Sequence, residues 1–332
     1  MLVSLRKTIN SSIMLAALWL AGCLLLWIAP AKLPHFLDEN HNLLPAVQFL
    51  QTILPPESIF TNLVCVALTI LNSILLSQLN NLFTFIREKT FLLPLTFIIL
   101  LSSFHSTHYN VSANLSLTFL LIAFFNFLKM YHNAEQTEEA FLGSLLISFV
   151  GWLFFPEFLL LFVAVWLGFW ILDTMSLRIF LASIVGLATP AIFCLAFVPT
   201  YFSIFVSHFE IMIDKWAVFL QSSFNFQFFF ICILLLLWIL SLIGIFSSRL
   251  RDNVRTRVNL NFALFFFINA LVIIICFPQT FLAFLPVMSA LFAVFFAHPV
   301  TLRNSNFFNI VFIIFCGANV IYVLCNLIAN YL

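Results

Sequence analysis

The chain has 332 residues, of which 64% are hydrophobic and only 8% are charged. A soluble domain carries charge on about a quarter of its residues, and a chain this poor in polar residues cannot cover its own surface against water. Lipid is therefore expected to be the solvent for most of it. The formal net charge of +1 gives no bulk attraction to nucleic acid, so no nucleic-acid partner is expected.

The N-terminal apolar run follows Arg6 and Lys7, as in a secretory signal. Residues 20–23 read Leu-Ala-Gly-Cys, which is similar to a bacterial lipoprotein cleavage box. The apolar run continues past Cys23 to residue 29, whereas a lipoprotein would turn polar there. We therefore predict an uncleaved first span. The seven cysteines all lie in apolar runs without metal-ligand spacing, so we interpret them as small buried hydrophobic residues.

Long apolar runs recur along the whole chain. A helix needs about 20 residues to cross the bilayer core, and only helices or closed barrels satisfy their backbone in lipid. Continuous apolar runs exclude the alternating pattern of a barrel strand. The predicted fold class is all-α, a polytopic transmembrane helical bundle of about eleven spans, with a range of about nine to twelve. The predicted spans are 13–30, 59–77, 91–104, 115–130, 141–155, 158–173, 179–198, 226–247, 261–277, 281–298 and 306–328.

Two of the short spans, 141–155 and 158–173, could instead form one re-entrant hairpin broken at Pro156-Glu157. No soluble domain fits between the spans, so residues 1–332 are expected to form a single integral membrane unit.

Two amphipathic segments, 43–54 and 201–221, occupy the longest gaps between spans. We predict that both are interfacial helices on the outer face.

Lysines and arginines segregate to alternate loops, which indicates orientation because cytoplasmic loops are enriched in them. An N-terminus in the cytoplasm leaves only Lys32 and Lys215 outside. The basic residues then placed inside are Arg6, Lys7, Arg87, Lys89, Lys129, Arg178, Arg249, Arg251, Arg255, Arg257 and Arg303. Among them, Arg249, Arg251, Arg255 and Arg257 lie on one short loop, which either fixes topology or contacts anionic lipid headgroups.

Carboxylates and histidines gather on the predicted outer face, where they could run acid–base chemistry or hold a divalent cation. The strongest candidates are Asp38 and Glu39, in the first outer loop. A carboxylate there could act as a base, or hold a divalent cation against a phosphate leaving group. The alternative is a solvated surface loop.

Three further candidates lie on the same face. His105 and His108 are spaced for a metal only if their stretch is helical, and they are otherwise structural. Glu157 follows Pro156 in a short turn, where a carboxylate near the membrane is costly unless it is paired or wetted. No predicted span carries a charge at its middle, which argues against an ion-coupled pump or proton relay.

The stretch from Leu79 to about Pro190 resembles a family of uncharacterised polytopic membrane proteins from Bacteroidetes. The residues that carry the resemblance are Leu79-Asn80-Asn81 with Arg87 and Thr90, the turn Gly151-Trp152-Leu153-Phe154-Phe155-Pro156, and Ser176-Leu177-Arg178 leading to Ala182-Ser183, Gly186-Leu187-Ala188 and Pro190. The resemblance implies a multi-pass protein of the inner membrane of a Gram-negative bacterium, with its outer face in the periplasm. It implies no activity.

A second resemblance is architectural. Polytopic glycosyltransferases that use lipid-linked sugar donors also place an acidic residue in the first outer loop, followed by interfacial helices; Asp38 or Glu39 and segment 43–54 match this pattern. The chain departs from it in being short and in lacking a soluble acceptor-binding domain. Three functions therefore stay open: an envelope enzyme with a periplasm-facing site and a lipid-linked substrate, a non-catalytic assembly subunit, and a transporter or lipid flippase.

Overall fold

The computed structural model describes residues 44–55, 58–87, 90–133, 135–197, 205, 226–248, 252–302 and 306–331. The predicted first span, the loop of Asp38 and Glu39, and segment 201–221 apart from Phe205 lie outside the described residues. All described regular elements are helical, which confirms the all-α class. They are α3 (Pro45–Ile53), α4 (Ile59–Phe83), α5 (Leu92–Ser103), η2 (His105–His108), α6 (Val111–Lys129), α7 (Thr137–Leu153), η3 (Pro156–Leu161), α8 (Phe162–Ile171), α9 (Leu177–Phe197), α12 (Phe226–Ser248), α13 (Val254–Cys276), η5 (Pro278–Thr280), α14 (Phe281–Leu302) and α15 (Asn306–Tyr331).

Long apolar helices dominate this set. Within the described ranges, seven are long and apolar enough to cross a membrane: α4, α6, α9, α12, α13, α14 with η5, and α15. The shorter apolar helices, Leu92–Ser103 and Pro156–Ile171, fall on two of the short predicted spans. A helix is also confirmed at Pro45–Ile53, inside the predicted amphipathic segment 43–54.

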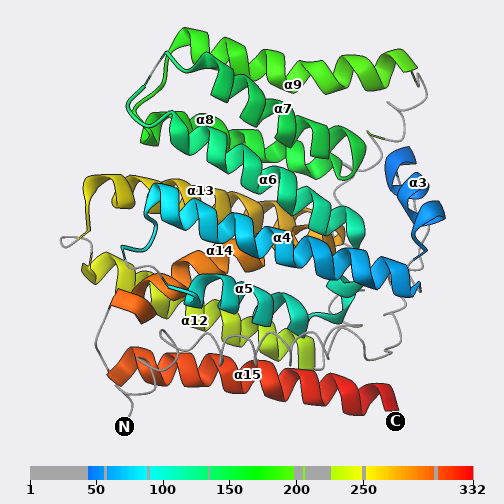
Figure 1. Ribbon diagram of the computed structural model, residues 1–332, viewed down its shortest axis with the longest axis vertical. Helices are drawn as coiled ribbons and strands as arrows, with labels where there is room; N and C mark the ends of the chain where they lie inside the picture. Colours follow the sequence, from blue (N-terminus) through cyan, green and yellow to red (C-terminus); the bar gives the residue numbers. More distant parts are fainter. Residues whose placement is uncertain are drawn as a thin grey trace.

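Successive long helices run in opposite directions, so their termini collect at two ends of the bundle (Figure 1). One end, which we call the basic end, receives the C-termini of α4, α6, α8, α12 and α14. Every lysine and arginine that the structure describes lies there: Arg87, Lys129, Arg178, Arg255 and Arg257. The other end, which we call the histidine end, carries η2 and η3.

The shortest apolar helix, α5, lies inside the protein. Its twelve residues extend about 18 Å at 1.5 Å per residue, well short of a hydrocarbon core of about 30 Å. Eleven of the twelve are buried, because α4, α14 and α15 pack around it. Most of its backbone and side chains therefore meet protein rather than lipid.

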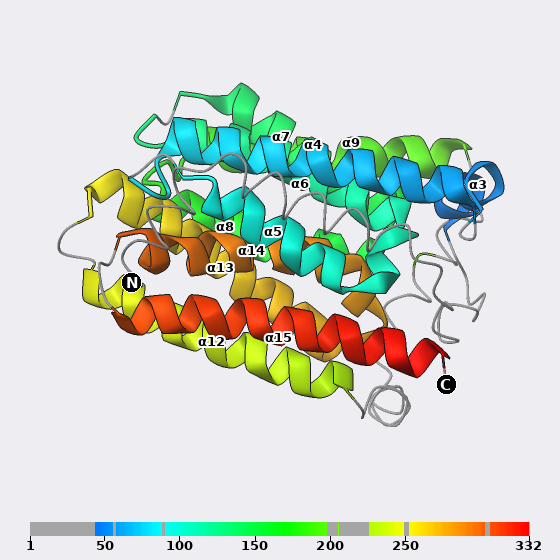
Figure 2. The ribbon, with the colours of Figure 1, turned by 60° about the horizontal axis from the view of Figure 1, so that its bottom comes forward.

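Helix α14 is the other enclosed element. All but a few of its residues are buried, among α5, α6, α12, α13 and α15. Figure 2 shows α12 and α15 side by side along one flank of the bundle, with α14 deeper within it.

Aromatic side chains fill the interface between α6 and α13. The ring of Phe262 packs against Phe124, Phe127 and Phe266, with centroids 5.0 to 6.2 Å apart. A Cβ on Gly168 of α8 would collide with the same Phe262 ring, so a glycine is needed where α8 crosses α13.

The outer surfaces of the peripheral helices are apolar. Exposed side chains include Ile70 on α4, Val185 on α9, Ile239 on α12 and Ile314 on α15. Such surfaces indicate lipid contact, because a soluble monomer rarely exposes large contiguous apolar patches.

This surface corrects the expectation that the cysteines are buried. Cys65 is buried, whereas Cys232 and Cys276 are exposed. An apolar side chain gains little by avoiding a hydrocarbon solvent, so lipid-facing positions accept cysteine.

Candidate functional site

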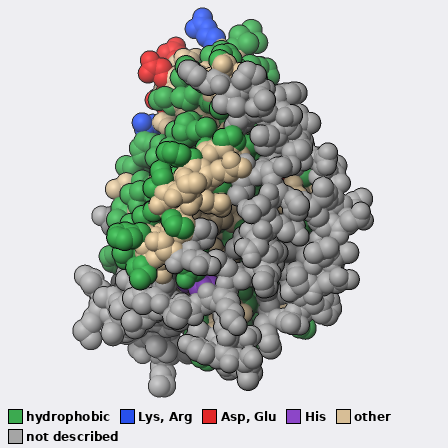
Figure 3. All heavy atoms as spheres, turned by 90° about the vertical axis from the view of Figure 1, so that its right-hand side faces the viewer, with side chains coloured by type: hydrophobic (Ala, Val, Ile, Leu, Met, Phe, Trp, Pro, Cys, Tyr) green, Lys and Arg blue, Asp and Glu red, His purple; other side chains and the backbone are tan. Residues whose placement is uncertain are grey.

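Two of the predicted site residues come together at the histidine end. His105 and His108 begin and end the 3-10 turn η2, with their rings edge to face at a centroid distance of 5.0 Å. The His105 ring also meets Tyr109 at 5.2 Å. Figure 3 faces this end, where the described side chains are mainly hydrophobic and a histidine surface is visible.

His108 is an interior group. It is 1% exposed, and its Nε2 lies 3.1 Å from the carbonyl oxygen of Ser102. Burial, followed by the neighbouring His105, lowers the pKa of His108 to about 3, while the hydrogen bond to Ser102 acts in the opposite direction. His108 is therefore neutral near pH 7, with Nε2–H donating to Ser102.

The predicted metal site finds no complete ligand set in this part of the molecule. Across the described ranges, no group of three or more histidine, cysteine, aspartate or glutamate side chains could hold a metal ion. Asp38 and Glu39, the strongest candidates, lie outside the described residues.

Glu157 lies at the same end but on another element. It is 2% exposed and occupies the first turn of η3, directly after Pro156. The structure thus brings the two histidines together and keeps Glu157 on a separate turn.

A group of buried polar residues that the sequence analysis did not single out lies at the basic end. We call it the polar junction, and it consists of Asn80, Arg87, Asp252, Thr256, Asn259 and His298. It joins the end of α4, the start of α13 and the last turns of α14.

Hydrogen bonds in the junction cap the C-terminus of α4. Thr256 donates from Oγ1 to the carbonyl oxygen of Thr84 (2.8 Å), and Asn259 donates from Nδ2 to that of Phe83 (2.7 Å). Asn80 accepts from the backbone N–H of Ile86 through Oδ1 (2.7 Å). The last carbonyls of a helix have no intrahelical partner, so α13 supplies the partners that α4 lacks.

Charged groups of the junction meet at Asp252. Nε of Arg87 lies 3.4 Å from its Oδ1, and Nε2 of His298 lies 3.5 Å from its Oδ2. The Asp252 side chain is 2% exposed and that of His298 is wholly buried, whereas Arg87 remains 35% exposed. The sequence offered one signal, an acidic residue among the arginines of the loop 249–257.

Polar side chains also join α4 to α6 deeper in the bundle. Asn72 donates from Nδ2 to the carbonyl oxygen of Asn114 (3.0 Å) and accepts from Thr118 Oγ1 through Oδ1 (2.8 Å). Interhelical bonds of this kind hold membrane helices together where the hydrophobic effect cannot.

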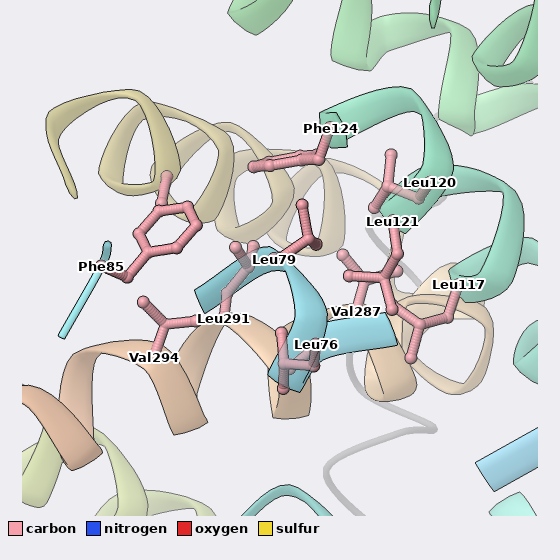
Figure 4. Close-up of a pocket in the computed structure, with 12 residues that line it drawn as sticks. Leu76, Leu79, Phe85, Leu117, Leu120, Leu121, Phe124, Val287, Leu291 and Val294 are labelled. Carbon is pink, nitrogen blue, oxygen red and sulfur yellow. The ribbon is translucent and has the colours of Figure 1, made fainter. Parts of the chain in front are cut away.

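An apolar layer separates these bonds from the polar junction. Leu76, Leu79, Leu121, Phe124 and Val294 belong to it, and they surround a small cavity between α4, α6, α13 and α14 (Figure 4). At about 20 Å³, this cavity holds about one water molecule by volume, and its lining offers that water no polar side chain. It is too small for a sugar or a lipid chain.

The long apolar helices and the lipid-facing surface define a multi-pass membrane protein. Comparison with protein-family models, with curated proteins and with solved structures gave no match.

Proposed function

We propose that this chain is an inner-membrane protein of a Gram-negative bacterium, that its basic end lies in the cytoplasm, and that it acts as a non-catalytic assembly subunit of an envelope machine. The packing of the described helices supports this proposal. α5 and α14 are enclosed by protein, and the cavity beside them is small and apolar. A bundle packed in this way holds a fixed shape, which suits a subunit that positions partners.

The orientation rests on charge. The five described basic residues share one end of the bundle, and cytoplasmic loops of membrane proteins are rich in lysine and arginine. Exposed Arg255, whose guanidinium lies 5.6 Å from the centroid of the Phe83 ring, would contact anionic headgroups there, together with Arg257.

Cysteine labelling tests the orientation. In a chain freed of its native cysteines, Asn133→Cys reports on the basic end and Ser106→Cys on the histidine end. We expect a membrane-impermeant maleimide to label Ser106→Cys in spheroplasts and Asn133→Cys only after lysis. The reverse pattern would place the basic end in the periplasm.

A second candidate function is an envelope glycosyltransferase-like enzyme that uses a lipid-linked donor at the histidine end. The observation that favours it is the pairing of His105 with His108 beside Tyr109, at the end that also carries buried Glu157. Asp38 would act as base or cation ligand, and Glu39, His105, His108 and Glu157 would assist.

One complementation experiment separates the two functions. A deletion strain receives either the wild-type chain or the combined Asp38→Asn, Glu39→Gln variant, with membrane levels matched by immunoblot. The assembly subunit predicts full rescue, because its role needs no acid or base. Loss of rescue at equal protein level would instead support the enzyme.

A further inference from the structure

Four buried polar atoms of the junction lack hydrogen bonds: Oδ1 of Asn259, Oδ2 of Asp252 and both ring nitrogens of His298. The last three belong to one pair of side chains, Asp252 and His298. A buried polar atom without a partner is costly, and Nε2 and Oδ2 can relieve that cost by sharing a proton. Nε2 and Oδ2 face each other over 3.5 Å, a gap that leaves room for a proton and not for a larger ion.

We propose that Asp252 and His298 form a proton-binding site that exchanges with water at the basic end only. Taking up a proton from water forms one N–H bond on the imidazole and leaves a hydroxide or a water molecule behind, depending on the donor. The imidazolium then directs Nε2–H toward Oδ2 of Asp252, and its positive charge offsets that of the carboxylate. The site is independent of the assembly role and of the proposed orientation.

One acidic group faces His298. The Asp252 carboxylate, 3.5 Å from Nε2, attracts a proton to the ring, whereas the burial of the ring and the guanidinium of Arg87 oppose a positive charge there. Of the helices packed against α14, α13 carries Arg255 and Arg257 and α6 carries Lys129, whereas α5, α12 and α15 contain no aspartate, glutamate, lysine, arginine or histidine. The turn η2 carries His105 and His108, at the opposite end of the bundle from His298. Within the described surroundings, Asp252 is thus the acidic group that acts on His298.

Access is one-sided. Arg87 connects Asp252 to water, since its side chain is 35% exposed and lies 3.4 Å from Oδ1. In the other direction, one turn before His298, Val294 belongs to the apolar layer with Leu291 and Leu79 (Figure 4). A bare charge does not cross such a layer without large cost.

Protonation would also alter the junction. When His298 is neutral, Arg87 is the one cation beside the carboxylate of Asp252. When His298 is protonated, that carboxylate faces two cations, the imidazolium and Arg87. Pro299 follows His298 directly and cannot donate a backbone hydrogen bond to the preceding turn of α14. The last turns of α14 therefore lack one backbone hydrogen bond beside His298, the residue whose charge would change.

The same bundle provides a matched control. His132 and Asp173, also at the basic end, pair at 3.2 Å between Nδ1 and Oδ2, but their side chains are 58% and 80% exposed. Water screens that pair, so it serves as the exposed counterpart of the buried pair.

Nitrogen NMR of the full chain, labelled with ¹⁵N-histidine and held in lipid nanodiscs, tests the proposal. We expect His298, assigned by its absence in His298→Gln, to convert reversibly to imidazolium as the pH is lowered from 9 to 4. Asp252→Asn should weaken proton binding by about tenfold or more, as expected for a close buried charge pair. Asp173→Asn should leave His298 unchanged.

Two results would overturn the site. One is a His298 that keeps the same protonation state from pH 9 to 4. The other is an effect of Asp252→Asn on proton binding by His298 that is no larger than the effect of Asp173→Asn on proton binding by His132. If His298→Gln does not fold, His298→Asn gives the assignment. For sidedness, proteoliposomes should hold a pH gradient as long as protein-free liposomes do. Faster collapse with the wild-type chain would show that protons reach the site from both ends.

Discussion

Asn259, in the second turn of α13, donates its side-chain Nδ2–H to the carbonyl oxygen of Phe83, the last residue of α4, over 2.7 Å. The two residues are 176 positions apart, and this bond fixes how the first and second halves of the chain meet at the basic end.

Replacing Asn259 by leucine should therefore destabilise the protein by about 1–2 kcal/mol, because a buried carbonyl loses its partner. The measurement is the free energy of unfolding in mild detergent, followed by denaturant titration. Asn253→Ala is the control, since Asn253 is exposed and its side chain makes no capping hydrogen bond to α13. Equal stability of the two variants would argue against the role of Asn259.

The interface between α7 and α9 depends on Gly186. A Cβ there would lie 2.6 Å from the backbone carbonyl oxygen of Phe141, and backbone does not move aside as a side chain can. Gly186→Ala should cost about 1–3 kcal/mol through overpacking.

Gly317→Ala on α15 is the opposite case, because a Cβ there meets nothing within 4 Å. It should leave stability unchanged or raise it by up to about 1 kcal/mol, as alanine favours a helix. Thermal unfolding of both variants checks the contrast, and a stable Gly186→Ala would show that α7 and α9 can separate freely.

The bond between Thr118 and Asn72 allows a conservative test. Thr118→Val keeps the shape but leaves Oδ1 of Asn72 without its 2.8 Å donor, which should cost about 1 kcal/mol. Thr118→Ser keeps the hydroxyl and should stay closer to the wild type in the same unfolding measurement. If serine is as damaging as valine, the packing of the methyl group matters more than the hydrogen bond.

Acid should destabilise the protein through His108. The unfolded chain binds a proton near the usual pKa of 6.5, whereas burial holds the native pKa near 3. The unfolded state therefore binds more protons between these values, so stability falls as pH drops below 6.5, by about 1.4 kcal/mol per unit at most. Unfolding measured at pH 7.5 and pH 5 should show a smaller difference in His108→Gln than in the wild type.

The exposed His132 provides the comparison for this effect. His132→Gln removes a histidine whose side chain is 58% exposed, so it controls for the substitution itself. An unchanged pH dependence in His108→Gln would mean that His108 is not the group responsible.

The helices could be predicted from the sequence because hydropathy acts over whole segments. The described long helices fall on predicted spans, and even the short apolar run 91–104 corresponds to α5. The end of α4 was missed by six residues, 77 against Phe83. Hydropathy drops at the polar residues around Asn80, yet the helix continues because Asn80 faces the interior and accepts from Ile86.

The polar junction could not be predicted in the same way. Asp252 and His298 are 46 positions apart, and each looks unremarkable in its own segment. The absence of charge in the middle of the spans argues against an ion-coupled pump or proton relay, and it gives no hint of His298. That residue lies in α14, four residues before the end of the helix, and it meets Asp252 there. Only tertiary packing shows that the two meet. For the histidine end, the spacing of His105 and His108 suits a shared site only if their stretch is helical, and the structure forms the 3-10 turn η2 there. The burial of His108 depends on how η2 packs, which the sequence does not show.

The enclosure of α5 has a consequence for biogenesis. Its wall includes α14, which the ribosome completes about 200 residues later. Until then, a segment too short to bridge the hydrocarbon, with Thr96, Ser102 and Ser103 among its buried residues, lacks part of its covering. In a nascent chain that ends before α14, helix α5 thus lacks one of its packing partners. Such a chain would expose α5 to membrane quality-control proteases.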